Sequence, residues 1–422
     1  MEKSFVLRGD VCYSKGPRAL ETIEGGYLVC EGGASMGAFA LLPERFRALA
    51  LVDHAGCLIM PGLIDLHTHA PQFAFRALGM DLTLLDWLNE HTFPEEARYL
   101  DPDYARAAYE RVVGALRRGA TTRACLYATV HREATIRLMD LCEASGLICY
   151  VGKVNMDRNA PDALREVSAA RSLADTRAWL ETVKGRYRNT RPILTPRFIP
   201  SCSDELLIGL AALGREFGLP IQSHLSENPA EIEWVKKLCP ESASYADAYR
   251  RRGLLGPSAI MAHAVWNDEA ELQLLKDSGT FIAHCPGSNM NLSSGIAPAR
   301  RYLDRGVKLG LGTDVAGGFS LSMLRAMSDA VQSSKLRWRL VDEGDAPLGA
   351  AEAFYLGTLG GGAFFGKAGS FEAGYEFDAV VLDDRALTAG RALTVAQRLE
   401  RAIYLSDDGQ IVSKYVRGAK LF

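Results

Sequence analysis

The chain lacks a cysteine pattern that would support disulfides or a thiolate metal site. Its nine cysteines are scattered over 422 residues, odd in number and never spaced as C-x-x-C. This distribution excludes a disulfide framework and a zinc cluster built from cysteines. We therefore expect a reducing, cytoplasmic compartment.

The chain also lacks a charge excess and long apolar runs. Its 48 lysines and arginines and 51 aspartates and glutamates leave a formal net charge of −3. Because nucleic-acid binding depends on basic residues that neutralise phosphates, we expect no nucleic-acid partner. No run of about 18 apolar residues occurs, so we expect no transmembrane helix and no membrane partner. Residues 1–5 contain an early acid and no apolar segment, which predicts that no signal peptide is present.

What the chain does have is ample material for a core, because 48% of its residues are hydrophobic. Its length fits two or three domains, or one large barrel with appendages. Within 61–366, eight short apolar runs alternate with amphipathic segments such as 204–217 and 268–277. The runs span 62–66, 121–126, 149–154, 193–195, 220–223, 259–262, 280–283 and 307–311.

This alternation predicts the fold class. Strands that alternate with helices form parallel α/β sheets, and eight such repeats predict a (β/α)₈ TIM-like barrel. A doubly wound sheet is the alternative. Its glycine-rich signal is incomplete, since Val315 stands where the third glycine belongs after Gly310-Leu311-Gly312.

Both ends of the chain are β-rich. We predict strands at 5–7, 26–30, 377–382 and 411–416. The two ends together predict a small composite β-sandwich domain. Its N-terminal part is 1–60 and its C-terminal part is 367–422, on either side of the barrel at 61–366.

Polar residues gather where the apolar runs end. The first run ends in His67 and His69, and the later runs end in His224, His263, His284 and Asp314. Barrel strands direct their carboxyl ends toward the active-site face. Side chains two apart on a strand face the same side, so His67 and His69 can bind one metal ion together.

The donor types predict the metal. Three imidazoles and one carboxylate, from His67, His69, His224 and Asp314, suit zinc, with iron as the alternative. The fourth run ends in Thr195-Pro196-Arg197 and has no lysine that could carry a bridging carbamate. We therefore predict one metal ion per chain and interpret Lys153, on the third run, as structural.

Two other features invite a catalytic interpretation. His131-Arg132-Glu133 matches the H-x-E part of a deaminase zinc site, but the chain lacks the accompanying P-C-x-x-C. We therefore interpret His131 as a loop residue. Cys285 follows His284 and is interpreted as a small buried residue rather than a nucleophile.

These residues resemble the amidohydrolase superfamily and, more narrowly, the guanine deaminase family. The segment 61–72, Pro-Gly-Leu-Ile-Asp-Leu-His-Thr-His-Ala-Pro-Gln, is similar to the family's P-G-[LVI]-[IV]-D-x-H-x-H-A-x-Q opening. Further similar segments are 86–88, 92–95, 151–157, 195–198, 222–228, 262–263, 283–286 and 311–318. The narrower resemblance, to the guanine deaminase family, rests on Gln72 and the segment 195–198. The similarity spans roughly residues 58–385 and is loose over 159–190.

The resemblance implies hydrolysis of guanine to xanthine and ammonia in purine catabolism, one zinc ion and a homodimer. It also implies that Glu227 shuttles protons. Glu227 lies three residues after His224, in the loop beyond the strand, which suits a general acid and base. His263 and Asp314 are placed to orient hydroxide and accept its proton.

The predicted substrate contacts are Gln72, Arg197, Phe198, His224, Glu227 and Asp314. Guanine presents two acceptors, O6 and N7, on one edge, and an arginine fork can donate to both. Adenine carries a donor at C6 that an arginine cannot satisfy. Phe198 packs against the purine or belongs to the core.

Two other functions remain open at this point. Some proteins similar to amidohydrolases are non-catalytic assembly proteins, but these typically lack part of the metal set. A related deaminase that acts on a pterin or an oxidised purine is the alternative among enzymes. Ammonia release and metal content distinguish these functions.

Overall fold

The computed structural model describes residues 4–387 and 390–422. Residues 1–3 of the predicted N-terminal segment and 388–389 of the C-terminal segment lie outside the described residues. Within these bounds, no helix is both long enough and apolar enough to cross a membrane.

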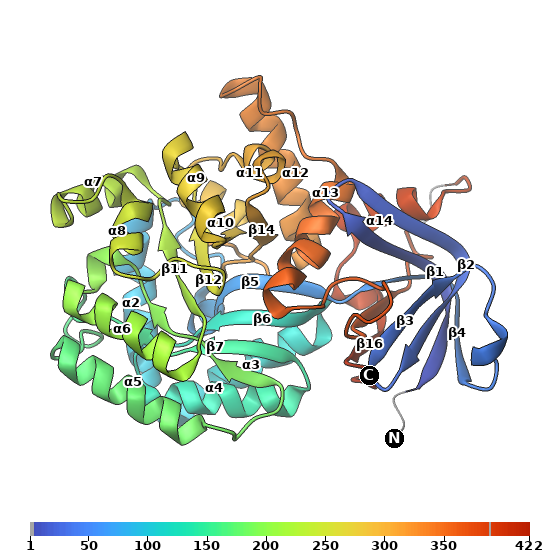
Figure 1. The fold of residues 1–422 in the computed structure, drawn as a ribbon, viewed down its shortest axis with the longest axis horizontal. Coiled ribbons are helices and arrows are strands. Elements are labelled where there is room, and N and C mark those ends of the chain that lie inside the picture. The colour runs from blue at the N-terminus through green and yellow to red at the C-terminus, as the bar shows by residue number, and fades with distance from the viewer. Residues whose placement is uncertain (1–3, 388–389) are drawn as a thin grey trace.

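The middle of the chain contains two parallel sheets of four strands each (Figure 1). The first sheet has the order β5 (Leu63–His69), β6 (Thr121–Tyr127), β7 (Ile148–Gly152) and β9 (Thr190–Pro192). The second has the order β11 (Ile221–Leu225), β12 (Ala259–His263), β13 (Phe281–His284) and β14 (Lys308–Leu311). Nearly every position on these strands is buried, as is typical of parallel sheets that are covered on both faces.

Backbone contacts join the two sheets at both of their edges. On one side, Leu194 forms a parallel bridge with Ile221. On the other side, the Asp314 amide donates to the His67 carbonyl at 2.8 Å, and the His69 amide donates to the Val315 carbonyl at 3.1 Å. These contacts bring the carboxyl ends of β5 and β14 together.

Seven of the eight predicted runs coincide with strands of these two sheets. The fourth run, 193–195, is interrupted: β9 ends at Pro192, and the short β10 (Thr195–Pro196) pairs with β8 (Val154–Asn155). Because proline has no N–H, Pro192 and Pro196 each remove one donor here, while the amides of Ile193 and Leu194 still donate to the carbonyls of Val151 and Pro220.

Helices follow most of the strands and lie around the outside of the sheets (Figure 1). The longer ones are α3 (Pro102–Arg118), α4 (Arg132–Ser145), α5 (Ala169–Val183), α6 (Asp204–Phe217), α7 (Pro229–Leu238), α9 (Glu269–Ser278) and α12 (Met323–Leu340). The shorter ones are α1 (Leu84–Trp87), α2 (Phe93–Ala97), α8 (Tyr245–Arg251), α10 (Pro286–Asn291), α11 (Ala299–Arg305) and α13 (Ala350–Tyr355).

Local signals set the bounds of these helices. The side chain of Ser203 accepts from the Leu206 amide at the start of α6, and Gly218 ends that helix in the left-handed region at φ 64°. The sequence pattern predicts this helix at the same residues, 204–217. The predicted helix at 268–277 corresponds to α9, which begins one residue later because Asp268 is its N-cap.

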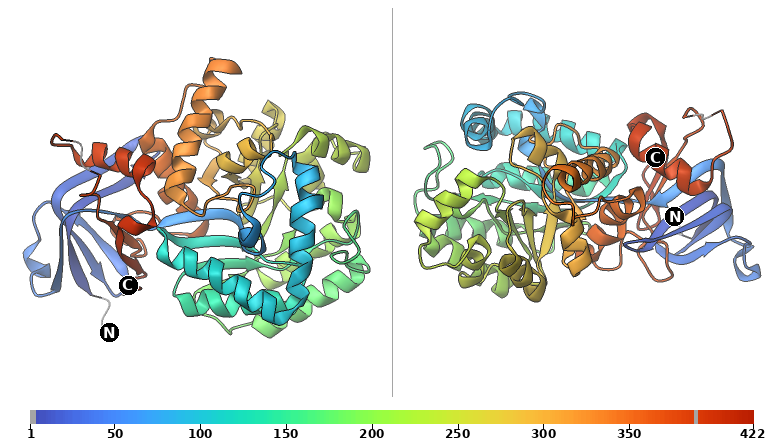
Figure 2. Two further views of the ribbon diagram at one scale, coloured as in Figure 1. Left: turned by 180° about the vertical axis from the view of Figure 1, so that it is seen from behind. Right: turned by 90° about the horizontal axis from the view of Figure 1, so that it is seen from above.

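Strands from both ends of the chain share one further sheet. Its order is β17 (Ala419–Lys420), β16 (Ile411–Val416), β15 (Ala379–Leu382), β4 (Ala50–Pro61), β1 (Phe5–Gly16), β2 (Ala19–Glu31) and β3 (Ala34–Phe39). Figure 2 shows it to one side of the parallel sheets, with both termini nearby.

The arrangement of these strands as a β-sandwich stays a prediction. The described strands of this region are hydrogen-bonded into one seven-stranded sheet. Its edge strand β3 also forms backbone hydrogen bonds with residues 374–377, just before β15. Helix α14 (Val395–Leu405) packs against β1, β2 and β4. The division of the chain at residues 60 and 366 stays a prediction.

Candidate metal and substrate site

The predicted site residues lie together at the carboxyl ends of the parallel strands. His67 and His69 come from β5, His224 from β11 and His263 from β12. Asp314 follows β14 by three residues. All five side chains are buried. The structure thus brings together residues that the sequence separates by up to 247 positions.

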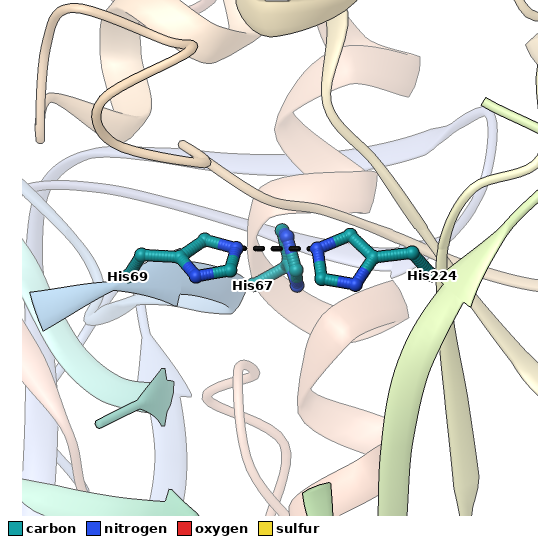
Figure 3. Close-up of side chains that lie close together, drawn as sticks. All are labelled: His67, His69 and His224. Atoms are coloured by element: carbon teal, nitrogen blue, oxygen red, sulfur yellow. Dashed lines mark hydrogen bonds between the residues drawn. The ribbon is translucent and has the colours of Figure 1, made fainter. Parts of the chain in front are cut away.

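Three of the imidazoles converge on one point. The Nε2 atoms of His69 and His224 face each other at 3.2 Å, with the His67 ring beside them (Figure 3). The Nδ1 of His224 donates to the Arg197 carbonyl at 2.6 Å. Since that nitrogen carries the proton, the His224 Nε2 presents a lone pair toward His69. Such an arrangement suits a shared metal ion.

Asp314 adds a carboxylate to the same point. Its Oδ1 lies 3.1 Å from the His67 Nε2 and 3.4 Å from the His69 Nε2. The buried His67 Nε2 makes no hydrogen bond within the described part of the chain. Ligand atoms of His67, His69 and His224 all lie within 4.8 Å of one another, and so do those of His67, His263 and Asp314.

The charge states of these groups suit metal binding. Burial and the neighbouring His67 lower the pKa of His69 and His224 well below the ordinary value, so both rings are neutral. Burial alone would raise the pKa of Asp314, but the neighbouring imidazoles, His67 first, outweigh it and lower that pKa. Neutral imidazoles and an ionised carboxylate are the forms in which these residues bind a metal. The residues present therefore fit a metal ion.

Glu227 and His263 form a second pair beside the ligand set. The Glu227 Oε2 lies 3.3 Å from the His263 Nε2, and the hydroxyl of Ser294 donates to Oε1 at 3.2 Å. Burial raises the pKa of Glu227 well above its ordinary value, and the charge of Asp314 adds to this effect. A carboxyl group with such a pKa can carry a proton near neutral pH.

Asn289 orients His263, a role that the sequence analysis missed. The Nδ1 of His263 and the Oδ1 of Asn289 are 2.9 Å apart. Because a carboxamide oxygen only accepts, His263 Nδ1 donates, and its Nε2 is the ring nitrogen that faces Glu227. Asn289 lies in α10, where no spacing signal connects it to His263.

Tyr127 is a further residue that the sequence analysis missed. Its ring on β6 lies 4.4 Å from the ring of His69, 4.9 Å from that of His67 and 5.1 Å from that of His224. It therefore packs against all three converging imidazoles and limits their rotation. Its position at the end of a predicted strand is the one signal that could have pointed to it.

A pocket opens above these residues. Its polar lining includes Gln72 and Arg197, together with His69, His224, Glu227, His263 and Asp314. Its apolar lining consists of Leu84, Trp87, Leu88, Phe198 and Leu292. The structure thus places all six predicted substrate contacts around one pocket. Phe198 is buried and lines this pocket as well, with its ring 6.5 Å from that of His224.

Arg197 has a partner that the sequence analysis did not identify. Its Nη1 and Nη2 donate to the carboxylate of Glu96, at 2.7 and 3.2 Å. Gln72 Nε2 donates to the same carboxylate at 3.0 Å. The adjacent acids Glu95 and Glu96 carry no signal that tells which of them faces the pocket.

Other residues considered from the sequence lie outside this pocket. Lys153 pairs with Glu166 at 2.6 Å, in agreement with a structural role. His131 precedes α4 and lines a different hollow. Burial raises the pKa of the Cys285 thiol well above its ordinary value, which disfavours a nucleophilic thiolate.

Comparisons with known proteins place this site in context. A model of the amidohydrolase family matches residues 58–421. The crystal structure of guanine deaminase from C. acetobutylicum with bound guanine in the active site superimposes with a TM-score of 0.96 at 41% identity, over 99% of this chain and 100% of that one. Guanine deaminase from Mus musculus is 40% identical over 86% of this chain and 82% of its own length. Guanine deaminase from Escherichia coli is 35% identical over 90% of this chain and 86% of its own length.

Proposed function

The chain belongs to the amidohydrolase family, and we propose that it hydrolyses guanine to xanthine and ammonia. The observation that carries the proposal is the convergence of three imidazoles and one carboxylate beneath a pocket lined by Arg197 and Gln72. The similarity to a guanine deaminase with bound guanine supports the choice of substrate. The complete ligand set argues against a non-catalytic assembly protein.

We propose one zinc ion per chain, held by His67, His69, His224 and Asp314. Imidazole nitrogens and a carboxylate oxygen are ordinary zinc ligands, and iron is the alternative. When bound, zinc acts as a Lewis acid that lowers the pKa of water from 15.7 to about 7. The hydrogen bond from His224 to the Arg197 carbonyl fixes that ring for binding.

The side chains around this point handle the protons. His263 and Asp314 hold the attacking water and accept its proton. Glu227 gives a proton to the ring nitrogen next to C2, so that C2 can become tetrahedral. The C2–N bond then breaks, and the amino group leaves as ammonia with the proton that His263 and Asp314 accepted. The remaining proton of the added hydroxyl returns to Glu227 as the C2=O bond forms. One water is consumed, and xanthine remains.

Arg197 and Gln72 select the substrate in this proposal. Glu96 occupies the Nη1 and Nη2 end of the guanidinium, so the Nε–H and the second Nη2–H remain as a parallel pair of donors. That pair matches the O6 and N7 acceptors of guanine. Phe198 packs against the purine ring, whose face needs an apolar or aromatic neighbour.

Further features of the proposal concern the assembly and setting of the protein. The eight parallel strands are proposed to close into a (β/α)₈ barrel, since backbone contacts join the two sheets at both edges. The shared sheet of both termini is proposed as a composite domain. A homodimer, a cytoplasmic location and a role in purine catabolism complete the proposal.

A screen for ammonia release tests this function. Purified protein would be assayed with guanine, adenine, a pterin and an oxidised purine, and its metal content would be measured in parallel. Guanine should be turned over with the highest kcat/KM, at about one metal equivalent per chain. A higher kcat/KM for the pterin or the oxidised purine would identify that compound, rather than guanine, as the substrate. No ammonia from any compound, at full metal occupancy, would refute the enzymatic function.

A further inference from the structure

We propose that Glu96 is a positioning residue that fixes the two side chains through which this pocket reads guanine. The inference rests on the proposed function, because it concerns how the same pocket recognises its substrate. Glu96 belongs to α2, which follows the pocket-lining residues Leu84, Trp87 and Leu88 in the chain. It does not line the pocket, and it acts through Arg197 and Gln72.

The first step is the pair between Glu96 and Arg197. Both side chains are almost fully buried, at 1% and 3% exposure, and two hydrogen bonds of 2.7 and 3.2 Å join them. A buried guanidinium without a carboxylate partner would be strongly unfavourable. The two parallel bonds also fix the plane of the guanidinium, and therefore the direction of its remaining N–H groups.

The second step is the orientation of Gln72. Its Nε2 donates to the Glu96 Oε1 at 3.0 Å, and its Oε1 accepts from the Ala316 amide at 3.1 Å. A flipped carboxamide would place oxygen against the carboxylate and NH₂ against an N–H. Glu96 and the Ala316 amide therefore leave Gln72 with one donor and one acceptor in fixed directions.

The third step is that one carboxylate connects two different chain segments. Gln72 follows β5, whereas Arg197 follows β10, and Glu96 holds both in one arrangement. A change at Glu96 should therefore disturb both substrate contacts while leaving the ligand imidazoles in place. The Glu96 side chain makes its hydrogen bonds, among described residues, to Arg197 and Gln72.

The adjacent Glu95 provides a matched control. It lies on the same helix and is also buried, but its carboxylate pairs with Arg98 at 3.1 Å and accepts from the hydroxyl of Tyr104. Neither partner lines the pocket. Glu95→Gln therefore makes the same chemical change one residue away without altering Arg197 or Gln72.

The test is a double-mutant cycle. In Glu96→Gln, an amide oxygen at the Oε1 position can still accept from Gln72 and from Arg197 Nη2, but the NH₂ at the Oε2 position opposes the Nη1–H of Arg197. We expect kcat/KM for guanine to fall at least 30-fold, mainly through KM, with metal content unchanged. In the Arg197→Met background the same change should cost less than threefold, because the Arg197 contact that it disturbs is already gone and the amide oxygen keeps the hydrogen bond from Gln72. Glu95→Gln should stay within threefold of wild type.

Each outcome decides the inference. Equal losses from Glu96→Gln in the two backgrounds would mean that Glu96 has a purely structural role, and this result would overturn the inference. A near-normal kcat/KM in the single Glu96→Gln variant would overturn it as well. If Glu96→Gln does not fold, Glu96→Asp keeps the charge but shortens the reach, and it should lose at least tenfold in kcat/KM. Full activity of that variant would overturn the inference. A wild-type protein without guanine turnover would instead refute the proposed function.

Discussion

Replacing Glu227 with glutamine should abolish most turnover while leaving the fold and the metal site intact. In the structure, the Glu227 Oε1 accepts from Ser294 and its Oε2 faces the His263 Nε2 at 3.3 Å. His263 Nδ1 is the donor to Asn289, and in the neutral form of this ring the facing Nε2 is an acceptor. A protonated Glu227 would donate to it, and the NH₂ of glutamine can donate in the same direction.

The amide therefore reproduces the hydrogen bonds of the protonated acid but cannot release or accept a proton. The expected loss is that of general acid–base catalysis, about 10²–10⁴-fold in kcat. At about 1.36 kcal/mol for each factor of ten, this corresponds to roughly 2.7–5.4 kcal/mol of transition-state stabilisation. KM should change little, because the isosteric side chain keeps the shape of the pocket.

The assay is ammonia release under saturating guanine, with metal content and melting temperature measured on the same preparation. Glu233→Gln is the matched control, since Glu233 is an exposed residue of α7 that pairs with Lys236. It should behave as wild type. If Glu227→Gln kept turnover within about threefold of wild type at equal metal content, Glu227 would not be the proton carrier.

Three more outcomes can be measured. Removal of the metal with a chelator should abolish activity and lower the melting temperature. One equivalent of zinc per chain should restore both. A full restoration that needs two equivalents would contradict a single metal site. Arg197→Met should lower kcat/KM for guanine at least about 100-fold, or roughly 2.7 kcal/mol, with unchanged metal content, and near-normal turnover would exclude Arg197 from recognition. Lys414→Met should destabilise the fold by about 1–3 kcal/mol in urea unfolding, because the buried Lys414 Nζ donates to the carbonyls of Leu116, Arg117 and Gly119. An unchanged unfolding midpoint would contradict that last role.

The residues that could be predicted from the sequence are those whose roles follow from local geometry. His67 and His69 share a face because side chains alternate along a strand. His224, His263 and Asp314 end or follow later apolar runs, so a parallel fold brings them to the same end of the sheets. The sequence cannot show that the His69 and His224 nitrogens lie 3.2 Å apart, since that distance depends on how the two sheets meet.

Residues whose roles depend on tertiary packing could not be predicted. Glu96 is one of two adjacent acids, and only the placement of α2 over the pocket decides which carboxylate meets Arg197. Asn289 and Tyr127 act on histidines that are far away in the sequence. Nothing in their own neighbourhood reveals this.

The fourth run shows where a local pattern falls short. The run 193–195 has strand-like residues, but the prolines at 192 and 196 remove donors that a continuous strand needs. The amphipathic segment at 395–405 forms a helix that packs on the sheet shared by both ends of the chain, which the strands expected at those ends did not indicate.

The contact between β5 and β14 has a consequence for how the protein is made. Asp65 accepts from the Thr313 amide at 3.0 Å across a sequence separation of 248 residues, next to His67 and Asp314. Closing a loop of this length costs about 5 kcal/mol of chain entropy, in addition to a term that does not depend on loop length. Contacts that form late in folding must offset this cost. At a synthesis rate of about 5–20 residues per second, His67 leaves the ribosome roughly 12–50 s before Asp314. During that interval the nascent chain can offer His67 and His69, and later His224, but not Asp314 to a passing metal ion, so the complete ligand set is available only after β14 has been synthesised.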